Sequence, residues 1–309
     1  MGPVHTPPLT IAYLHPKYWP LWIGQALLWL LVQLPYGWQM RLGKALGRFS
    51  MRLQPRRVAI AQRNLQLAMP ELDEPARAVL LRQNFESVGC AIFETGMAWF
   101  WSDQRMRKFM QVEGEEHLRA ALAGGHGILL LSCHFLTLEL NARMFGLLQA
   151  GVGVYRPNDN PVLEFAQVRG RTRSNKYLLD RRDVKGMIKA LRQGEALWYA
   201  PDHDYGRHAS VFVPFFAVQD SATITGTATL ARVKGVRVMP CYTLRLPEHA
   251  GYRLVLEAPL ANFPTGDDIA DATLSNQVIE RAIRQAPEQY MWLHRRFKTQ
   301  PDKQSPSRY

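Results

Sequence analysis

The sequence has few cysteines and lacks the motifs of several common enzyme classes. Its three cysteines, Cys90, Cys133 and Cys241, lie far apart and form no CxxC pair. This argues against a disulfide framework or a zinc cage and indicates a reducing compartment. The GxSxG turn of serine hydrolases and the HExxH pattern of zinc proteases are also missing. We therefore expect neither a metal nor a cofactor.

Acidic residues are the minority among the charged ones. The 309 residues include 26 Asp and Glu against 38 Lys and Arg, for a formal net charge of +12 and a pI near 9.8. Such a surplus predicts an anionic partner, without deciding between nucleic acid, phospholipid and an acidic protein or substrate. With 47% hydrophobic and 21% charged residues, the chain can bury a large core and is not intrinsically disordered.

One long segment carries no charge at all. Residues 18–38 read YWPLWIGQALLWLLVQLPYGW, about the length that crosses a bilayer. Six Lys and Arg follow between residues 41 and 57, whereas Lys17 alone precedes the segment, so its C-terminal side should be cytoplasmic. We expect a transmembrane or membrane-embedded helix after a short N-terminal segment, residues 1–17. A helix in the membrane plane is the alternative, because two Gln and two Pro interrupt the run.

Beyond the anchor, the pattern changes from helical to alternating. Residues 39–101 predict a helical membrane-proximal region, and residues 102–309 an α/β core, with 39–309 as one folding unit. Short apolar runs predict buried strands, and amphipathic stretches between them predict helices. The expected fold class is therefore three-layer α/β, with a mostly parallel central sheet flanked by helices. The expected strands are 128–132, 151–155, 196–200, 236–244 and 252–258, and one expected helix runs from Ser221 to Ala231.

A histidine stands where the strand 128–132 ends. His134 begins HFLTLE, and Glu139 follows five residues later. The two side chains can meet if His134 precedes the helix and folds back, and a carboxylate on Nδ1 would then leave Nε2 free as a base. The position fits either chemistry or a buried hydrogen bond. Cys133 should face the other way and pack in the core.

Other polar residues follow later strands. Asp202, His203 and Asp204 come directly after the strand 196–200 and suggest either a binding pocket or a structural turn; a metal site with His208 lacks the expected ligand spacing. A basic cluster follows the strand 151–155, and it is either a solvated face or an anion site. Its members are Arg156, Arg169, Arg171, Arg173 and Lys176. A second basic patch lies at His294, Arg295, Arg296 and Lys298.

Several blocks in order carry a family resemblance. HFLTLE, YRPNDNP, RGRTRSNK, YAPDHDYG, VFVPFFA and EQYMWLHRRFKT resemble the late acyltransferases of lipid A biosynthesis in Gram-negative bacteria. The start and the tail, YLHPKYWPLWIG and PSRY, resemble the lauroyl-transferring members. The resemblance implies transfer of an acyl chain from acyl carrier protein to a hydroxyacyl chain of Kdo2-lipid IVA, and the likeness to the lauroyl-transferring members implies laurate as that chain. It implies the cytoplasmic face of the bacterial inner membrane and no nucleic acid.

The resemblance also assigns roles. Its HX4D/E motif matches His134 and Glu139 as the catalytic pair, with His134 as the base. Substrate-binding roles fall on Arg156, Arg171, Lys176, Asp202 and Asp204. Two alternatives stay open: a lysophospholipid-type acyltransferase or thioesterase with the same pair, and a membrane-tethered protein that binds nucleic acid or anionic lipid without chemistry.

Overall fold

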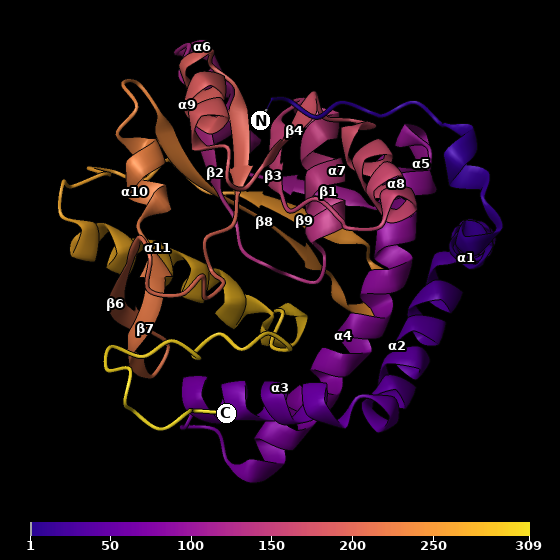
Figure 1. Cartoon of the computed structure of the whole chain (residues 1–309), viewed down its shortest axis with the longest axis horizontal. Coiled ribbons are helices and arrows are strands. Elements are labelled where there is room, and N and C mark those ends of the chain that lie inside the picture. The colour runs from indigo at the N-terminus through magenta and orange to yellow at the C-terminus, as the bar shows by residue number, and fades with distance from the viewer. Residues whose placement is uncertain (1) are drawn as a thin grey trace.

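A central sheet organises the molecule. The computed structural model describes residues 2–309, and its main sheet has seven strands in the order β1-β9-β8-β2-β5-β3-β4 (Figure 1). All neighbouring pairs are parallel except β8 and β9, which are antiparallel. The strands are β1 Met110–Glu113, β2 Ile128–Leu131, β3 Val152–Tyr155, β4 Tyr177–Asp180, β5 Ala196–Tyr199, β8 Arg237–Arg245 and β9 Tyr252–Leu256; β6 Ser210–Phe215 and β7 Val218–Ile224 form a separate hairpin.

Helices flank both faces of the sheet. Successive side chains of a strand point to opposite faces, and all four residues of β2 are buried. Leu129 and Leu131 pack in one apolar cluster with α9 to α11, while Ile128 and Leu130 pack in another with α4, α6 and α7. The expected three-layer arrangement is therefore confirmed. The helices are α1 Trp19–Leu31, α2 Tyr36–Leu53, α3 Pro55–Ala68, α4 Glu74–Phe100, α5 Asp103–Arg107, α6 Glu115–Ala123, α7 Leu138–Leu148, α8 Pro161–Thr172, α9 Val184–Arg192, α10 Gly226–Ala231 and α11 Asp268–Gln285.

The expected membrane-spanning helix is corrected. α1 has 13 residues, so it is about 20 Å long at ~1.5 Å per residue, against the ~30 Å of a bilayer core. It ends at Leu31, and α2 starts at Tyr36 after Pro35. The turn between them is held by Gln39, whose Nε2 donates to the carbonyls of Val32 and Leu34. Within residues 2–309, every helix is too short or too polar to cross a membrane.

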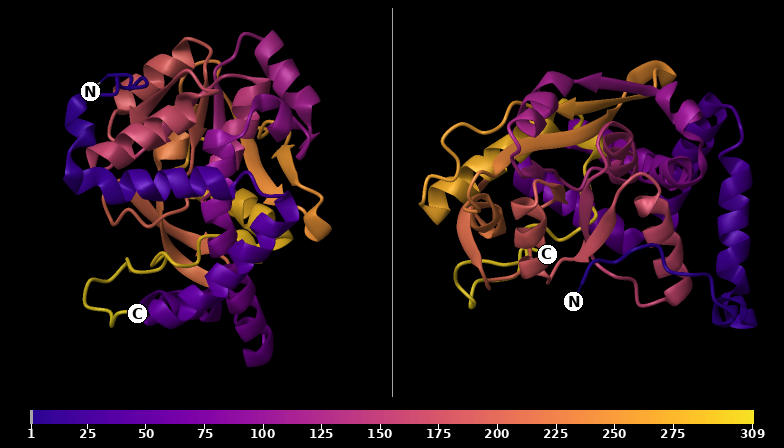
Figure 2. Two further views of the ribbon diagram at one scale, coloured as in Figure 1. Left: turned by 90° about the vertical axis from the view of Figure 1, so that its right-hand side faces the viewer. Right: turned by 90° about the horizontal axis from the view of Figure 1, so that it is seen from above.

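The helices α2 and α4 cross with their backbones in contact. A Cβ atom added at Gly89 would lie 2.0 Å from the carbonyl oxygen of Gly43, and one added at Gly47 would lie 2.0 Å from that of Phe85. Glycine is therefore required at this crossing. The crossing lies on the side of the molecule away from the hairpin β6–β7 (Figure 1), and α1 runs along the outer edge of the molecule (Figure 2).

Most other expected elements match, with one exception. The five expected strands are all present within two residues at each end. The helix expected from Ser221 is wrong, because residues up to Ile224 form β7 and the helix starts at Gly226. Thr and Ile favour extended backbone, and pairing with β6 outweighs the helical spacing.

Candidate active site

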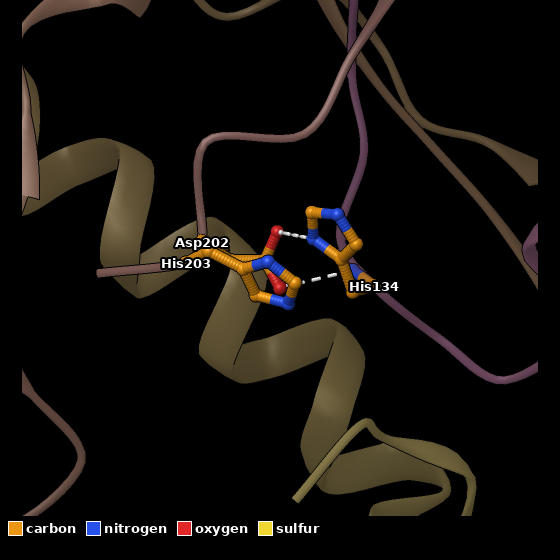
Figure 3. A group of neighbouring side chains, drawn as sticks. All are labelled: His134, Asp202 and His203. Atoms are coloured by element: carbon orange, nitrogen blue, oxygen red, sulfur yellow. Dashed lines mark hydrogen bonds and ion pairs between the residues drawn. The ribbon is translucent and has the colours of Figure 1, made fainter. Parts of the chain in front are cut away.

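The site begins where two neighbouring strands end. β2 and β5 pair in parallel, with Leu131 opposite Tyr199. His134 and Asp202 each follow the last residue of their strand by three positions. Because parallel strands end at the same edge of a sheet, both side chains reach one place (Figure 3).

Asp202 holds the imidazole of His134. The Nδ1 atom of His134 lies 2.7 Å from Oδ1 of Asp202, and the backbone N–H of His134 donates to Oδ2 at 2.9 Å. The hydroxyl of Tyr290 donates to the same Oδ2 at 2.9 Å. Burial alone would raise the pKa of Asp202, but the charge and hydrogen bonds of His134 outweigh it and hold this pKa well below its usual value. The carboxylate is therefore ionised, and an Nδ1–H donated to it leaves Nε2 as a lone pair.

The expected pair of His134 with Glu139 is not what the structure contains. Glu139 accepts hydrogen bonds from Arg171, with Nη2 at 2.6 Å from Oε1, and from Trp99 Nε1 at 3.0 Å. The physical reason is the path of the chain. α7 begins only at Leu138, so His134 lies in the loop before it. There its Nδ1 forms a hydrogen bond with Asp202, which follows β5.

His134 borders a basic open cavity of about 890 Å³. Arg156 lies at its wall just after β3, and Arg181 and Arg182 follow β4. Asp204 is the one carboxylate among the lining residues of the described chain. Four guanidinium or ammonium groups around one cavity favour phosphate and carboxylate ligands. The cationic lining residues are Arg156, Arg181, Arg182 and Lys298.

The remaining expected binding residues have other partners. Lys176 forms an ion pair with Glu195 at 2.6 Å, and Arg171 is bound by Glu139; neither lines the cavity. Asp204 does line it, but its carboxylate accepts from the backbone N–H and hydroxyl of Thr299, each at 2.8 Å. Asp204 thereby holds the C-terminal segment in place through Thr299. Of the expected residues, Arg156 is the cation that faces the cavity.

Comparisons with known proteins show the family of this chain. The profile of the bacterial lipid A biosynthesis acyltransferase family matches residues 7–299. The chain belongs to this family. It is 53% identical to the lipid A biosynthesis lauroyltransferase of Escherichia coli K12 over 98% of this chain and 99% of that protein. The palmitoleoyltransferase of the same organism is 44% identical over 94% of each chain, and its myristoyltransferase is 25% identical over 96% and 92%.

A second, apolar pocket adjoins the basic cavity of this lipid A acyltransferase. The two share Val154 and Trp198. The pocket lies between the strands β2 to β5 and the helix α7, and Arg171 is its charged lining residue. Its free volume is about 30 Å³, enough for one or two water molecules and too small for a hydrocarbon chain. Its apolar side chains include Leu130, Leu138, Ala142, Phe145, Val152 and Leu178.

Cys133 takes no part in the acyltransferase site. It is buried in the cluster that contains Leu131, as expected, and burial raises the pKa of its thiol well above the usual value. A thiol in that state is a poor nucleophile. The aromatic run 212–216 likewise supplies core residues, Phe215 and Phe216.

The C-terminal basic patch is not a single surface. Arg296 is buried, and its Nη1 donates to the carbonyl of Ala222 at 2.8 Å. Its guanidinium also lies over the ring of Phe215. His294 and Lys298 instead line the cavity.

One group of side chains has the composition of a metal site. Ligand atoms of His134, Asp202 and His203 lie within 4.8 Å of one another. The imidazoles of His134 and His203 are stacked, however, with centroids 3.5 Å apart and planes 13° from parallel. A nitrogen lone pair lies in the plane of its ring, so stacked rings direct their lone pairs along parallel planes and not toward a common point. The geometry fits a proton-carrying pair with a stacked neighbour better than a chelate.

Sequence reasoning missed the partner of the base and its surroundings. From the sequence alone, Asp202 is a substrate-binding residue, Tyr290 has no role, and His294 belongs to a basic patch. The available signal was that PDH directly follows a buried strand. Without the strand order, this signal could not be connected to His134.

Proposed function

We propose that this lipid A acyltransferase moves a lauroyl chain from acyl carrier protein to a hydroxyacyl chain of Kdo2-lipid IVA, with His134 as the general base. The observation that carries the proposal is the His134–Asp202 pair at the edge of a basic cavity. The identity to the E. coli lauroyltransferase supports laurate as the donor chain.

In this reaction, Nε2 of His134 takes the proton of the acceptor's secondary hydroxyl. The hydroxyl oxygen attacks the thioester carbon, the C–S bond breaks, and the carrier's thiolate leaves and takes up the proton from His134. The ionised Asp202 stabilises the imidazolium while it exists. The acyl group passes directly between the substrates, so the enzyme needs no covalent intermediate.

The basic cavity suits the headgroup of the acceptor. The arginines of the basic cavity would hold the phosphates and sugar carboxylates of the acceptor. The apolar pocket would have to widen before it could receive the hydrocarbon chain of the donor. Arg171, which is bound by Glu139, lines the apolar pocket and not the basic cavity.

We further propose that the enzyme works on the cytoplasmic face of the inner membrane. One face of α1 and one of α2 expose large apolar side chains at helical spacing, and Arg41, Lys44, Arg48 and Arg52 lie exposed on α2. Such helices lie in the interface of an anionic bilayer. The exposed side chains are Trp19, Ile23, Leu27 and Leu30 of α1, and Trp38, Leu42, Leu46, Phe49 and Leu53 of α2.

The test is acyl transfer by purified protein in detergent. Lauroyl, myristoyl and palmitoleoyl carrier proteins are offered with Kdo2-lipid IVA or with a lysophospholipid, and the product is identified by mass spectrometry, with His134→Ala alongside. We expect the wild-type enzyme to transfer laurate and the His134→Ala protein to transfer none. Transfer to a lysophospholipid, or thioester loss to water without an acylated glycolipid, would contradict the substrate. Activity of the His134→Ala protein would contradict the base.

A further inference from the structure

Three imidazole rings form one continuous stack at the active site. The ring of His203 lies 3.5 Å from that of His134, with planes at 13°, and 4.2 Å from that of His294, with planes at 10°. The three residues come from three separate segments, the loop after β2, the loop after β5 and the C-terminal segment. Figure 3 shows the ring of His203 beside His134 and Asp202.

The middle ring is uncharged near neutral pH. Burial, the neighbouring His134, and further cations lower the pKa of His203 to about 3. Its Nε2 is buried and has no hydrogen-bond partner among residues 2–309. Burial and the nearby Lys298 also lower the pKa of His294. The stack therefore presents a neutral aromatic face to the base.

The two contacts of His134 constrain different motions. An imidazole N–H points along the plane of its ring, so the hydrogen bond to Asp202 sets which nitrogen faces the cavity. It leaves the ring free to tilt about the Nδ1–Oδ1 line. A flat ring at van der Waals distance across the face of the imidazole removes that tilt and excludes water from the face.

We propose that His203 is a positioning residue, whose neutral ring, supported by His294, holds the plane of His134 so that Nε2 points at the acceptor hydroxyl. The proposal rests on the proposed function, since it takes His134 as the base. When His134 becomes a cation during the reaction, the face of a neutral aromatic ring tolerates the charge, whereas a second cation would oppose it. The flat shape of the His203 ring holds the plane of His134, and the ring nitrogens of His203 take no part.

This distinction can be tested by substitution. His203→Phe keeps a flat ring, so kcat should stay within about threefold of the wild type. His203→Ala removes the ring, and kcat should fall about tenfold or more, with the KM of both substrates changed less than threefold. His203→Leu fills the space without a flat ring and should resemble Ala. Thermal unfolding shows whether each variant is folded. If the Ala protein is not, the Leu protein takes its place in the test.

The matched control is His117→Ala, which alters a histidine on α6. It should leave kcat and KM unchanged. Wild-type kcat in His203→Ala or His203→Leu, or a loss in His203→Phe as large as in His203→Leu, would overturn the proposal. His134→Ala is measured in parallel, so that an active His134→Ala protein counts against the proposed base, and an inactive one with normal His203 variants counts against the stack alone.

A pH profile separates a neutral support from a proton carrier. If the ring acts only by its shape, the pH dependence of kcat/KM in His203→Phe should overlay that of the wild type. A displaced profile would show that His203 exchanges protons during turnover and would overturn the proposal. The titratable and charged groups that face His203 remain in this variant; they are His134, Asp202, Tyr205, His294 and Arg296.

Discussion

The Nδ1 atom of His134 lies 2.7 Å from Oδ1 of Asp202, across two strands that are neighbours in space and 68 residues apart in the chain. This contact sets the tautomer of the base. The other carboxylate oxygen is already occupied by two donors, the backbone N–H of His134 and the hydroxyl of Tyr290. The orientation of Asp202 is therefore fixed, and so is the nitrogen of His134 that faces the cavity.

Replacing Asp202 by Asn should reverse the tautomer of His134. The two donors at Oδ2 require the amide oxygen there, so the amide NH2 must face Nδ1. Nδ1 then becomes the acceptor, Nε2 carries the proton, and the base is blocked. We expect kcat to fall by about 10²–10⁴-fold, measured as laurate transfer at saturating substrates. Asp268→Asn, in an exposed ion pair with Arg232, is the control, and normal turnover in Asp202→Asn would contradict the assignment.

Removing Arg156 should weaken acceptor binding more than turnover. Its side chain is 68% exposed at the cavity wall, and its nearest acidic partner, Asp159, is 3.8 Å away. It is therefore available to a ligand anion. Arg156→Ala should raise the KM for Kdo2-lipid IVA by about tenfold. Arg119→Ala on α6 is the matched surface control, and an unchanged KM and kcat in Arg156→Ala would refute the role.

Neutralising Glu139 should destabilise the fold through Arg171. The two side chains are 11% and 15% exposed and 2.6 Å apart, so Glu139→Gln leaves a largely buried cation without its counter-charge. We expect a loss of about 3 kcal/mol in the free energy of unfolding, measured with urea in detergent.

The double variant Glu139→Gln, Arg171→Met should lose less, because it removes the stranded charge as well. Glu115→Gln, which breaks the exposed pair with Arg119, should cost at most about 1 kcal/mol. Equal losses in the exposed and the buried pair would contradict this account.

Acid should destabilise the wild type more steeply than His203→Phe. The folded protein holds His203 neutral, with a pKa of about 3, whereas the unfolded chain protonates it below about pH 6.5. Between these values the unfolded state binds one more proton, so stability falls as pH falls. The slope of the unfolding free energy between pH 4 and 6 should be smaller in His203→Phe by about 1.4 kcal/mol per pH unit. Identical slopes would show that His203 is protonated in the folded state.

Local patterns were sufficient for the layers of the fold. The run ILLL is buried on both faces, as its composition predicted. Gly194, which follows α9, has a φ of +78°, which glycine adopts without strain. Between Ser221 and Ile224 a helix and a strand compete for the same residues, and pairing with the preceding strand β6 decided, which the helical spacing did not reveal.

The apolar segment 18–38 likewise shows how far its structure can be predicted from the sequence. Composition alone identified 18–38 as the apolar segment, but the structure breaks it into α1 and the start of α2. The break is stabilised by contacts from elsewhere. Trp101, at the end of α4, donates its indole N–H to the carbonyl of Val32 at 2.7 Å. No property of residues 18–38 predicts this partner.

The sequence by itself determined which residues follow three of the strands. His134 follows one buried strand, the segment PDHD follows a second, and basic residues follow a third. It determined these because strand ends can be read from apolar runs and the residues after them. The tertiary structure alone decided that β2 and β5 are neighbours, and hence that Asp202, and not Glu139, binds the base. It also decided that His203 and His294 stack behind His134, because such contacts depend on strand order and on the path of the C-terminal segment.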